Sequence, residues 1–520
     1  MLVSMLIVSG VLFYALVLLQ TWKVSLLLAS QEDRISGELT VDTNDYLHKL
    51  LRKHDLSPRV EWAAWNILST QSQEKWTSLT RVPHIFRPSQ PEVFDSRGEH
   101  PPSAEMTSRT LTLPSPRNSS LGQSDASRFL FGVCTTYERL MENDRAILRS
   151  WQRWLTDGQR GSNGAHLVVN LASADGDQMR QIKSALEEMD IPATVYHSGE
   201  QLSAASRYAQ LAGALHAYAS ALSSVYASKR WFALIDDDVF FPSLSRLEQK
   251  LGMFDAQDQV YIGAPGHRED WEGHHNGTPS ASGGGGVVIL SRRGLGRYIA
   301  LACAERRVSG SSSRPARQWA STFHECLSTR GGQPMDALPG LDWPTAEDRK
   351  SFWTDARDGD GRRPLALRSR PEGKDLDAAR AHLVADACGE DCFLQRFLFR
   401  DGWVLVNGVS ISQYLNPLPT QRDVELRAAA GATREGPAAQ LQLAPGGGGA
   451  RGGGGGGARN VWHLLDSSVD DYGVVWQAYV KRDVPEKRAP TAAGAEALDS
   501  IIILIWDKGK RGRITGPGKR

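Results

Sequence analysis

Short apolar runs alternate with longer amphipathic segments along the middle of the chain. Four of the apolar runs predict buried strands, at residues 128–136, 166–173, 191–198 and 231–235. The segments between them carry apolar residues at helical spacing, at residues 137–157, 177–190 and 201–224. This alternation predicts an α/β fold with a mostly parallel sheet that is covered by helices.

Further apolar runs follow toward the carboxyl terminus. Residues 259–265 predict another strand, and residues 283–302 read as a glycine loop, a strand and a helix. After a polar region, strand character returns at residues 392–411, and two last apolar runs, "YGVVWQAYV" and "SIIILIW", predict strands added to the main body. The glycine-rich run at 444–458 predicts a flexible insertion, because no strand leads into it and no helix follows.

The amino terminus has a different pattern. Residues 2–19 are uncharged and about as long as a helix that crosses a bilayer, which favours an uncleaved signal anchor over residues 1–22. A cleaved signal that ends near "LLLAS" is the alternative, and both place the rest of the chain in the secretory lumen. Residues 23–125 are polar and contain many prolines, so we expect a stem with one short helix near "DTNDYLHKLLRKH".

Charge and cysteine content narrow the functional classes. The chain has 60 Lys and Arg against 59 Asp and Glu, so no global field draws it to nucleic acid. The sequons at Asn118 and Asn276 agree with a lumenal location. Five cysteines are too few for a disulfide scaffold and show no zinc pattern, and the pairs to test first are Cys388 with Cys392 and Cys303 with Cys326.

Three consecutive aspartates, Asp236, Asp237 and Asp238, follow the apolar run "WFALI" directly. Adjacent carboxylates repel one another, and a divalent cation offsets that repulsion. Oxygen ligands favour a hard ion such as Mn²⁺ or Mg²⁺, which keeps open positions for phosphate oxygens. A solvated turn is one alternative. Another is a haloacid-dehalogenase-type phosphatase, although that class has Thr or Val where this chain has Phe240.

Several motifs in order resemble the fringe-like glycosyltransferases of family 31, especially the branch common in fungi. The motifs are "FGVCTTYERL", "WFALIDDDVFFPSL", "YIGAPG", "GGGGVVILSRRGL", "CGEDCFLQRF" and "VLVNGVSISQY". The resemblance covers about residues 128–415 and implies a GT-A fold, a Rossmann-like nucleotide-sugar-binding sheet with helices on both faces. It also implies a UDP-sugar donor, Mn²⁺ and inverting transfer to a hydroxyl of a glycan or glycoprotein.

The resemblance assigns roles to individual residues. Asp236 and Asp237 match the positions that face ribose and metal, and Asp238 matches the metal ligand proper. The expected donor-binding residues are Thr135, Thr136 and Arg145 near the first strand and the loop glycines Gly284, Gly285 and Gly286, where the family has G-G-A-G. The metal ligands expected on this basis are Asp236 and Asp238.

The catalytic base and the rest of the metal site match the family less well. The family places its base in a segment like "GGDAL", so "GGQPMDAL" makes Asp336 the candidate, with Asp342 and Asp348 in reserve. Where the family has an "LHHW"-like stretch with a metal-binding histidine, this chain reads "PLALRSR". Either His382 or a water takes that place, or Arg368 meets phosphate directly.

These expectations predict the domain boundaries of the chain and its cellular location. A catalytic domain covers 126–415, with a nucleotide-binding part at 126–265 and an acceptor part at 266–415, and 416–520 form an extension. We expect a type II Golgi membrane protein, anchored by its amino-terminal helix, whose catalytic domain faces the lumen. The alternative is a non-catalytic relative that binds a UDP-sugar or a glycan with an incomplete metal site.

Overall fold

The structure is a computed structural model of the whole chain. It describes residues 43–72, 79–86, 92–98, 109–116, 125–157, 161–199, 202–220, 228–263, 286–303, 319–338, 340–341, 363–369, 376–414, 459–482 and 498–507. The chain divides into two compact units. In the small unit, α2 (Thr43–His54) is amphipathic, and His48 makes an edge-to-face contact with Phe94. The larger unit holds two main sheets and the candidate site.

The first main sheet has seven strands in the order β12-β10-β11-β8-β5-β6-β7. Neighbouring pairs show that six of them are parallel and that β11 runs in the opposite direction. The strands are β5 (Phe129–Thr136), β6 (His166–Ala172), β7 (Ala193–Ser198), β8 (Trp231–Ile235), β10 (Tyr261–Gly263), β11 (Val287–Ser291) and β12 (Asp336–Ala337). The predicted α/β fold with a mostly parallel sheet is confirmed.

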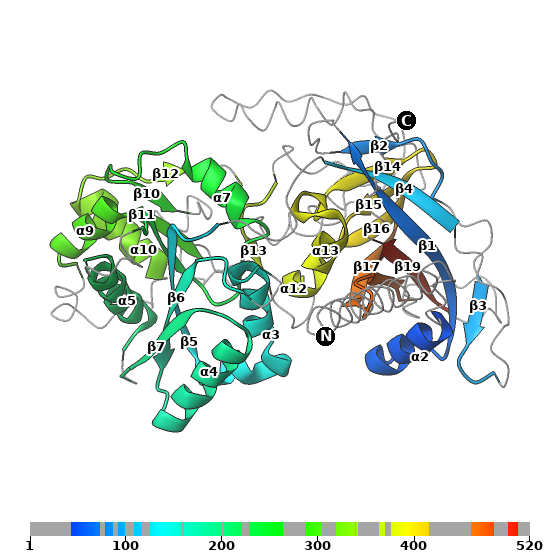
Figure 1. The fold of residues 1–520 in the computed structure, drawn as a ribbon, viewed down its shortest axis with the longest axis horizontal. Helices are drawn as coiled ribbons and strands as arrows, with labels where there is room; N and C mark the ends of the chain where they lie inside the picture. Colours follow the sequence, from blue (N-terminus) through cyan, green and yellow to red (C-terminus); the bar gives the residue numbers. More distant parts are fainter. Residues whose placement is uncertain are drawn as a thin grey trace, which may run out of the picture. The chain divides into compact units, whose positions relative to one another are not determined.

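Helices cover both faces of this sheet, as the ribbon in Figure 1 shows. Alternate residues of each strand enter different cores: Phe131 belongs to one core cluster and Leu130 to the other. The first cluster includes residues of α3 (Tyr137–Leu155), α4 (Gly176–Glu188) and α7 (Leu244–Leu251). The second includes α5 (Ala204–Ser220), α9 (Arg292–Ala300), α10 (Trp319–His324) and the π-helix η2 (Glu325–Arg330).

Capping residues fix where the helices begin beside the sheet. Thr136 ends β5, and its side chain accepts a hydrogen bond from the Arg139 N–H of the first turn of α3. Asp175 begins α4 with a capping box that includes Gln178. The path of α3 is broken at residues 142–145, where Arg145 and its neighbours have non-helical backbone angles.

The second main sheet is mostly antiparallel and runs in the order β2-β14-β15-β16-β17-β18-β19-β1-β3, with β4 parallel to β1. A two-stranded ladder, β9 (Val239–Phe240) with β13 (Leu367–Arg368), is separate from both sheets. The remaining strands are β1 (Arg59–Ser72), β2 (Thr80–Val82), β3 (Glu92–Asp95), β4 (Arg109–Pro116), β14 (Arg396–Phe399), β15 (Trp403–Val406), β16 (Ser410–Tyr414), β17 (Arg459–Val469), β18 (Val475–Lys481) and β19 (Asp499–Asp507). The short helices before β14 are α12 (Ala378–Ala381), η3 (His382–Val384), α13 (Ala385–Cys388) and η4 (Glu390–Cys392).

This sheet corrects the expected domain boundaries. Residues 59–116, assigned to a stem, supply β1 to β4, and Phe397 of β14 pairs with Thr80 of β2. The boundary at residue 415 divides one sheet, because β16 pairs with β17. The two last apolar runs do form strands, β18 and β19. Pairing with distant strands therefore gives structure to segments that appear irregular in sequence.

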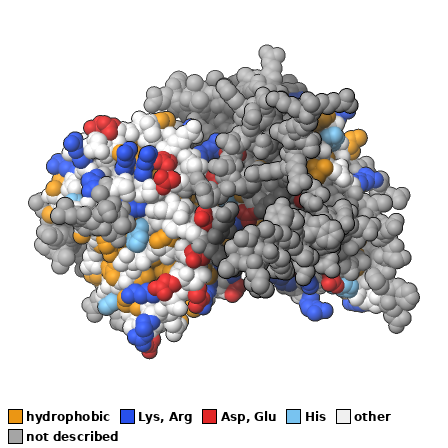
Figure 2. Space-filling view, viewed as in Figure 1, with side chains coloured by type: hydrophobic (Ala, Val, Ile, Leu, Met, Phe, Trp, Pro, Cys, Tyr) orange, Lys and Arg blue, Asp and Glu red, His pale blue; other side chains and the backbone are white. Residues whose placement is uncertain are grey.

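Three other expectations concern the membrane anchor, the disulfides and the surface charge. Among the helices of the described residues, none is both long and apolar enough to cross a membrane, and the expected anchor at 1–22 lies outside those residues. Both suggested disulfides are present, Cys303 with Cys326 and Cys388 with Cys392. Acidic and basic side chains are interspersed over the described surface in Figure 2, in keeping with the balanced charge of the sequence.

His382 is a buried connector rather than a metal ligand. Its Nε2 lies 3.0 Å from the Pro242 carbonyl oxygen, and its Nδ1 lies 3.1 Å from Nη2 of Arg153. The ring packs edge-on against Phe240 and Phe393. The neutral tautomer with Nε2–H satisfies both contacts, because Nε2 then donates to the carbonyl and Nδ1 accepts from Arg153. Both nitrogens are thus engaged away from the aspartates, and His382 does not replace the missing histidine.

We expect the burial of His382 to make the protein less stable in acid. Burial, reinforced by the positive charge of Arg153, lowers the pKa of His382 well below its ordinary value of 6.5. The unfolded chain therefore takes up the proton first, and stability is lost as the pH falls below about 6.5. In urea unfolding, His382→Gln should reduce this loss by up to about 1.4 kcal/mol per pH unit between about pH 6 and pH 5. His197→Gln is the control, because His197 is exposed. If the unfolding free energy of His382→Gln fell with pH as steeply as that of the wild type, the expectation would be wrong.

Candidate functional site

A cavity of about 330 Å³ opens at the carboxyl ends of β5 and β8. Its volume lies at the lower end of the range for small-molecule sites, and its position is where parallel sheets bind ligands. It is lined by Cys134, Thr135, Thr136, Arg139, Ala204, Arg207, Tyr208, Asp236, Asp237, Asp238, Trp319 and Arg368. The three aspartates therefore face a cavity, and a solvated turn is excluded.

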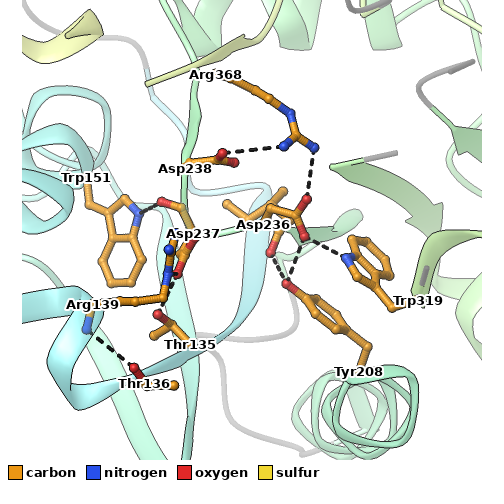
Figure 3. A network of polar contacts seen from close by, with 11 residues as sticks. Thr135, Thr136, Arg139, Trp151, Tyr208, Asp236, Asp237, Asp238, Trp319 and Arg368 are labelled. Atoms are coloured by element: carbon orange, nitrogen blue, oxygen red, sulfur yellow. Dashed lines mark hydrogen bonds and ion pairs between the residues drawn. The ribbon is translucent and has the colours of Figure 1, made fainter. Parts of the chain in front are cut away.

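Asp236 is held by aromatic donors on one side. Its Oδ1 accepts hydrogen bonds from Nε1 of Trp319 at 2.6 Å and from the Tyr208 hydroxyl at 3.4 Å (Figure 3). The two aromatic rings stack with centroids 3.9 Å apart, so each fixes the position of the other. Burial raises the pKa of Asp236 to about 6, against the opposing effect of the Arg368 charge.

Both side-chain oxygens of Asp237 accept hydrogen bonds from other side chains of the protein. Arg139 binds both of its oxygens, with Nε and Nη2 each at 2.7 Å. The Thr135 hydroxyl donates to Oδ2 at 2.6 Å, and Nε1 of Trp151 donates to the backbone carbonyl at 3.1 Å. The hydrogen bonds to Asp237 and its negative charge raise the pKa of Arg139, and the contacts together fix the turn after β8. Asp237 is therefore a positioning residue in this arrangement.

Arg368 joins the other two aspartates. Its Nη2 lies 3.1 Å from Oδ2 of Asp236, and its Nη1 lies 3.4 Å from Oδ2 of Asp238 (Figure 3). The β9–β13 ladder places it there, because Arg368 pairs with Val239, the residue after the aspartates. The Ser369 N–H also donates to the Asp238 carbonyl at 2.7 Å. The "PLALRSR" segment thus reaches the aspartates with an arginine in place of the histidine of the family pattern.

The described residues do not fit the expected divalent ion. An ion between Oδ2 of Asp236 and Oδ2 of Asp238 would stand where the guanidinium of Arg368 stands, and two cations repel at that distance. Within the described ranges, no three or more His, Cys, Asp and Glu side chains are grouped so that they could hold a metal. The pair predicted to bind Mn²⁺ is brought together, but around an arginine.

The other predicted site residues are placed as follows. Thr135 and Thr136 line the cavity, and Gly286 accepts a hydrogen bond from the Asp236 N–H at 2.9 Å. Arg145 is not among the residues that line the cavity: it lies in the break of α3, and its side chain pairs with Glu188 of α4 at 3.0 Å. The residues Gly284, Gly285, Asp342 and Asp348 lie outside the described ranges.

Asp336 lies on β12 and is absent from the residues that line the cavity. Sheet order places β12 three strands from β8, which is roughly 14 Å at the usual strand spacing. Burial raises the pKa of Asp336, a shift that makes its carboxylate a stronger base. Two strands, β10 and β11, thus lie between the strand of the candidate base and the strand that precedes the aspartates.

Sequence reasoning missed Arg139, Arg207, Tyr208 and Trp319 as lining residues. Arg139 had a signal, because it lies in the first helical turn after Thr135 and Thr136, at the sheet edge where ligands bind. No sequence signal pointed to Trp319, because it lies in the polar region for which no helix or strand was predicted. The arginine chosen from the sequence, Arg145, follows six residues later, in the break of α3.

A comparison with known protein families matches the part of the chain that contains the aspartates. Residues 177–318 match the family model described as "Fringe: Fringe-like", and this range contains the three aspartates. The expected family resemblance is therefore confirmed for this part of the chain. No curated protein matches the sequence significantly.

Solved structures also resemble the chain, at low identity. Glycosyltransferase GlyE of Streptococcus pneumoniae TIGR4 is 11% identical, with 48% of this chain and 57% of GlyE covered and a TM-score of 0.29. Mouse xyloside xylosyltransferase 1 is 13% identical, with 47% of this chain and 97% of the mouse protein covered and a TM-score of 0.27. At TM-scores this low, the likeness does not distinguish one α/β fold from another.

We expect Gly286→Ala to destabilise the protein, although the added methyl group is small. A Cβ at position 286 would stand 3.1 Å from Oδ2 of Asp236 and 3.2 Å from Nη2 of Arg368, and both groups are held by other contacts. Such overpacking costs about 1–3 kcal/mol. Gly213→Ala in α5 is the matched control, because its Cβ meets nothing within 4 Å. Gly213→Ala should stabilise the protein by up to about 1 kcal/mol. Equal stability of Gly286→Ala and wild type in urea unfolding would show that the site tolerates a side chain there.

Proposed function

We propose that the chain transfers a sugar from a UDP-sugar to a hydroxyl of a glycan or glycoprotein. The match of residues 177–318 to the fringe-like family model supports this proposal. The donor binds in the cavity at the ends of β5 and β8, on a sheet of the GT-A type. The observation that carries this proposal is the position of Asp236, Asp237 and Asp238, which lie within the matched segment and line that cavity.

The chemistry of the cavity supports a phosphate-bearing ligand. Three arginines, Arg139, Arg207 and Arg368, line it together with the three aspartates, so its formal charge is balanced although it is rich in fixed ions. Arginine is well suited to bind phosphate oxygens because its donors form a planar fork. Thr135 and Thr136 add hydroxyl groups at the end of β5.

In the proposed inverting reaction, the acceptor oxygen forms a bond to the anomeric carbon from the face opposite the diphosphate. The bond from that carbon to the phosphate oxygen breaks, and its electron pair leaves with UDP. The acceptor proton passes to a carboxylate base, for which Asp336 is the candidate. The raised pKa of Asp336 is in the direction that this role requires.

A non-catalytic binder of a UDP-sugar or glycan is the alternative. The observation that favours it is the absence of Asp336 from the residues lining the cavity. Both functions use the same cavity, and they differ in whether UDP is released from a bound donor.

We further propose that the chain is a single-pass type II protein of the Golgi membrane with this domain in the lumen. The uncharged run at residues 2–19 and the two disulfides support the proposal, since disulfides persist in oxidising compartments.

We expect the full-length chain to release UDP from at least one member of a panel of UDP-sugars. Asp236→Asn should lower UDP release by roughly 100-fold, because the amide weakens the ion pair that holds Arg368 in the cavity. Asp258→Asn is the matched control, since Asp258 is exposed and lies outside the cavity. UDP binding without release from any donor would favour the non-catalytic alternative, and release of inorganic phosphate from phosphate monoesters instead would favour a phosphatase.

Asp336→Asn tests the base separately from donor binding. If Asp336 removes the acceptor proton, the amide lowers turnover by about 10²–10⁴-fold, because it cannot accept that proton. The affinity for UDP should stay unchanged, since Asp336 does not line the cavity. Turnover with an acceptor and UDP binding by calorimetry give the two readouts. Full turnover in Asp336→Asn would assign the base to another residue.

A further inference from the structure

We propose that Arg368 provides the positive charge that the donor diphosphate requires, in the place that the sequence assigns to a divalent ion. This inference rests on the proposed function. It deepens that function, because it names the group that makes nucleotide binding independent of metal.

The guanidinium takes the oxygens that a metal would use. Nη2 and Nη1 of Arg368 face Oδ2 of Asp236 and Oδ2 of Asp238 at 3.1 and 3.4 Å. The two carboxylates thus converge on one cation, as they would on an ion, but the cation is covalently part of the chain. A planar fork that spans two carboxylates has a defined orientation, which a lone lysine would lack.

The surrounding backbone is built to keep Arg368 in this position. The Leu367–Phe240 and Arg368–Val239 pairs join β13 to β9, directly beyond the aspartates. Gly286 leaves room for the guanidinium, since a Cβ there would come within 3.2 Å of Nη2. The side chain is only 16% exposed, and it lines the cavity. Arg368 is therefore an enclosed and oriented cation, not a surface arginine.

The position also fits the charge that develops in the reaction. When the bond from the sugar to the phosphate oxygen breaks, negative charge accumulates on the departing UDP. Arg139 is bound by both oxygens of Asp237, whereas Arg368 is shared between single oxygens of two aspartates at longer distances. Arg368 lines the cavity between the two aspartates, so it is placed to stabilise that charge.

Calorimetry of UDP binding to the full-length chain, in EDTA and in Mn²⁺, tests this inference. We expect the wild-type affinity to be the same within about twofold in both conditions. In EDTA, Arg368→Gln should weaken UDP binding by at least about tenfold, as the loss of a charge-assisted hydrogen bond predicts. Arg368→Lys, which keeps the charge, should retain part of the affinity. Arg180→Gln is the matched control, since Arg180 is 76% exposed and lies outside the cavity.

The outcomes separate this inference from the function on which it rests. UDP binding that requires Mn²⁺ would overturn the inference and leave the proposed function standing. Metal-independent binding that Arg368→Gln leaves intact would also overturn it. If UDP fails to bind in either condition, the proposed function falls and the inference with it. If thermal melts show that Arg368→Gln does not fold, the inference is still tested in two ways. One is the wild-type affinity for UDP in EDTA and in Mn²⁺, and the other is the affinity of Arg368→Lys.

Discussion

The enclosure of three adjacent carboxylates at the end of β8 is the constraint on which the site depends. Asp237 and Asp238 are buried, and buried charges require partners. Those partners come from distant parts of the chain: Arg139 from the helix after β5 and Arg368 from β13. The charge cluster therefore determines which segments must meet, and the cavity is the space that remains among them.

The sheet explains why these segments can meet at one place. Strands β5 and β8 are parallel neighbours, so Thr135 at the end of one lies beside Asp237 after the other, and their side chains hydrogen bond. Helix α3 leaves β5 at once through the Thr136 cap and carries Arg139 in its first turn. A parallel arrangement thus converts two local sequence features into one site without any long loop.

Much of the seven-stranded sheet could be predicted because its strands are short apolar runs between amphipathic helices. The aspartates could be predicted because charge directly after a buried strand is unusual. The role of Arg368 could not be derived, because a two-residue strand has no periodicity and its pairing with Val239 depends on contacts about 130 residues away in sequence. Strand β1 was missed although Val60 and Trp62 alternate with less buried residues, because prolines nearby favoured an irregular stem.

A fixed guanidinium and an exchangeable ion place different demands on the protein. An ion brings its own charge and needs several well-placed ligands, whereas an arginine must be delivered and oriented by the backbone. Here the orienting contacts are present: β13 pairs with β9, the Ser369 N–H binds the Asp238 carbonyl, and Gly286 leaves the space. The same carboxylates that would hold an ion instead align the arginine. The segment that lacks the family histidine therefore supplies a positive charge to the aspartates in its place.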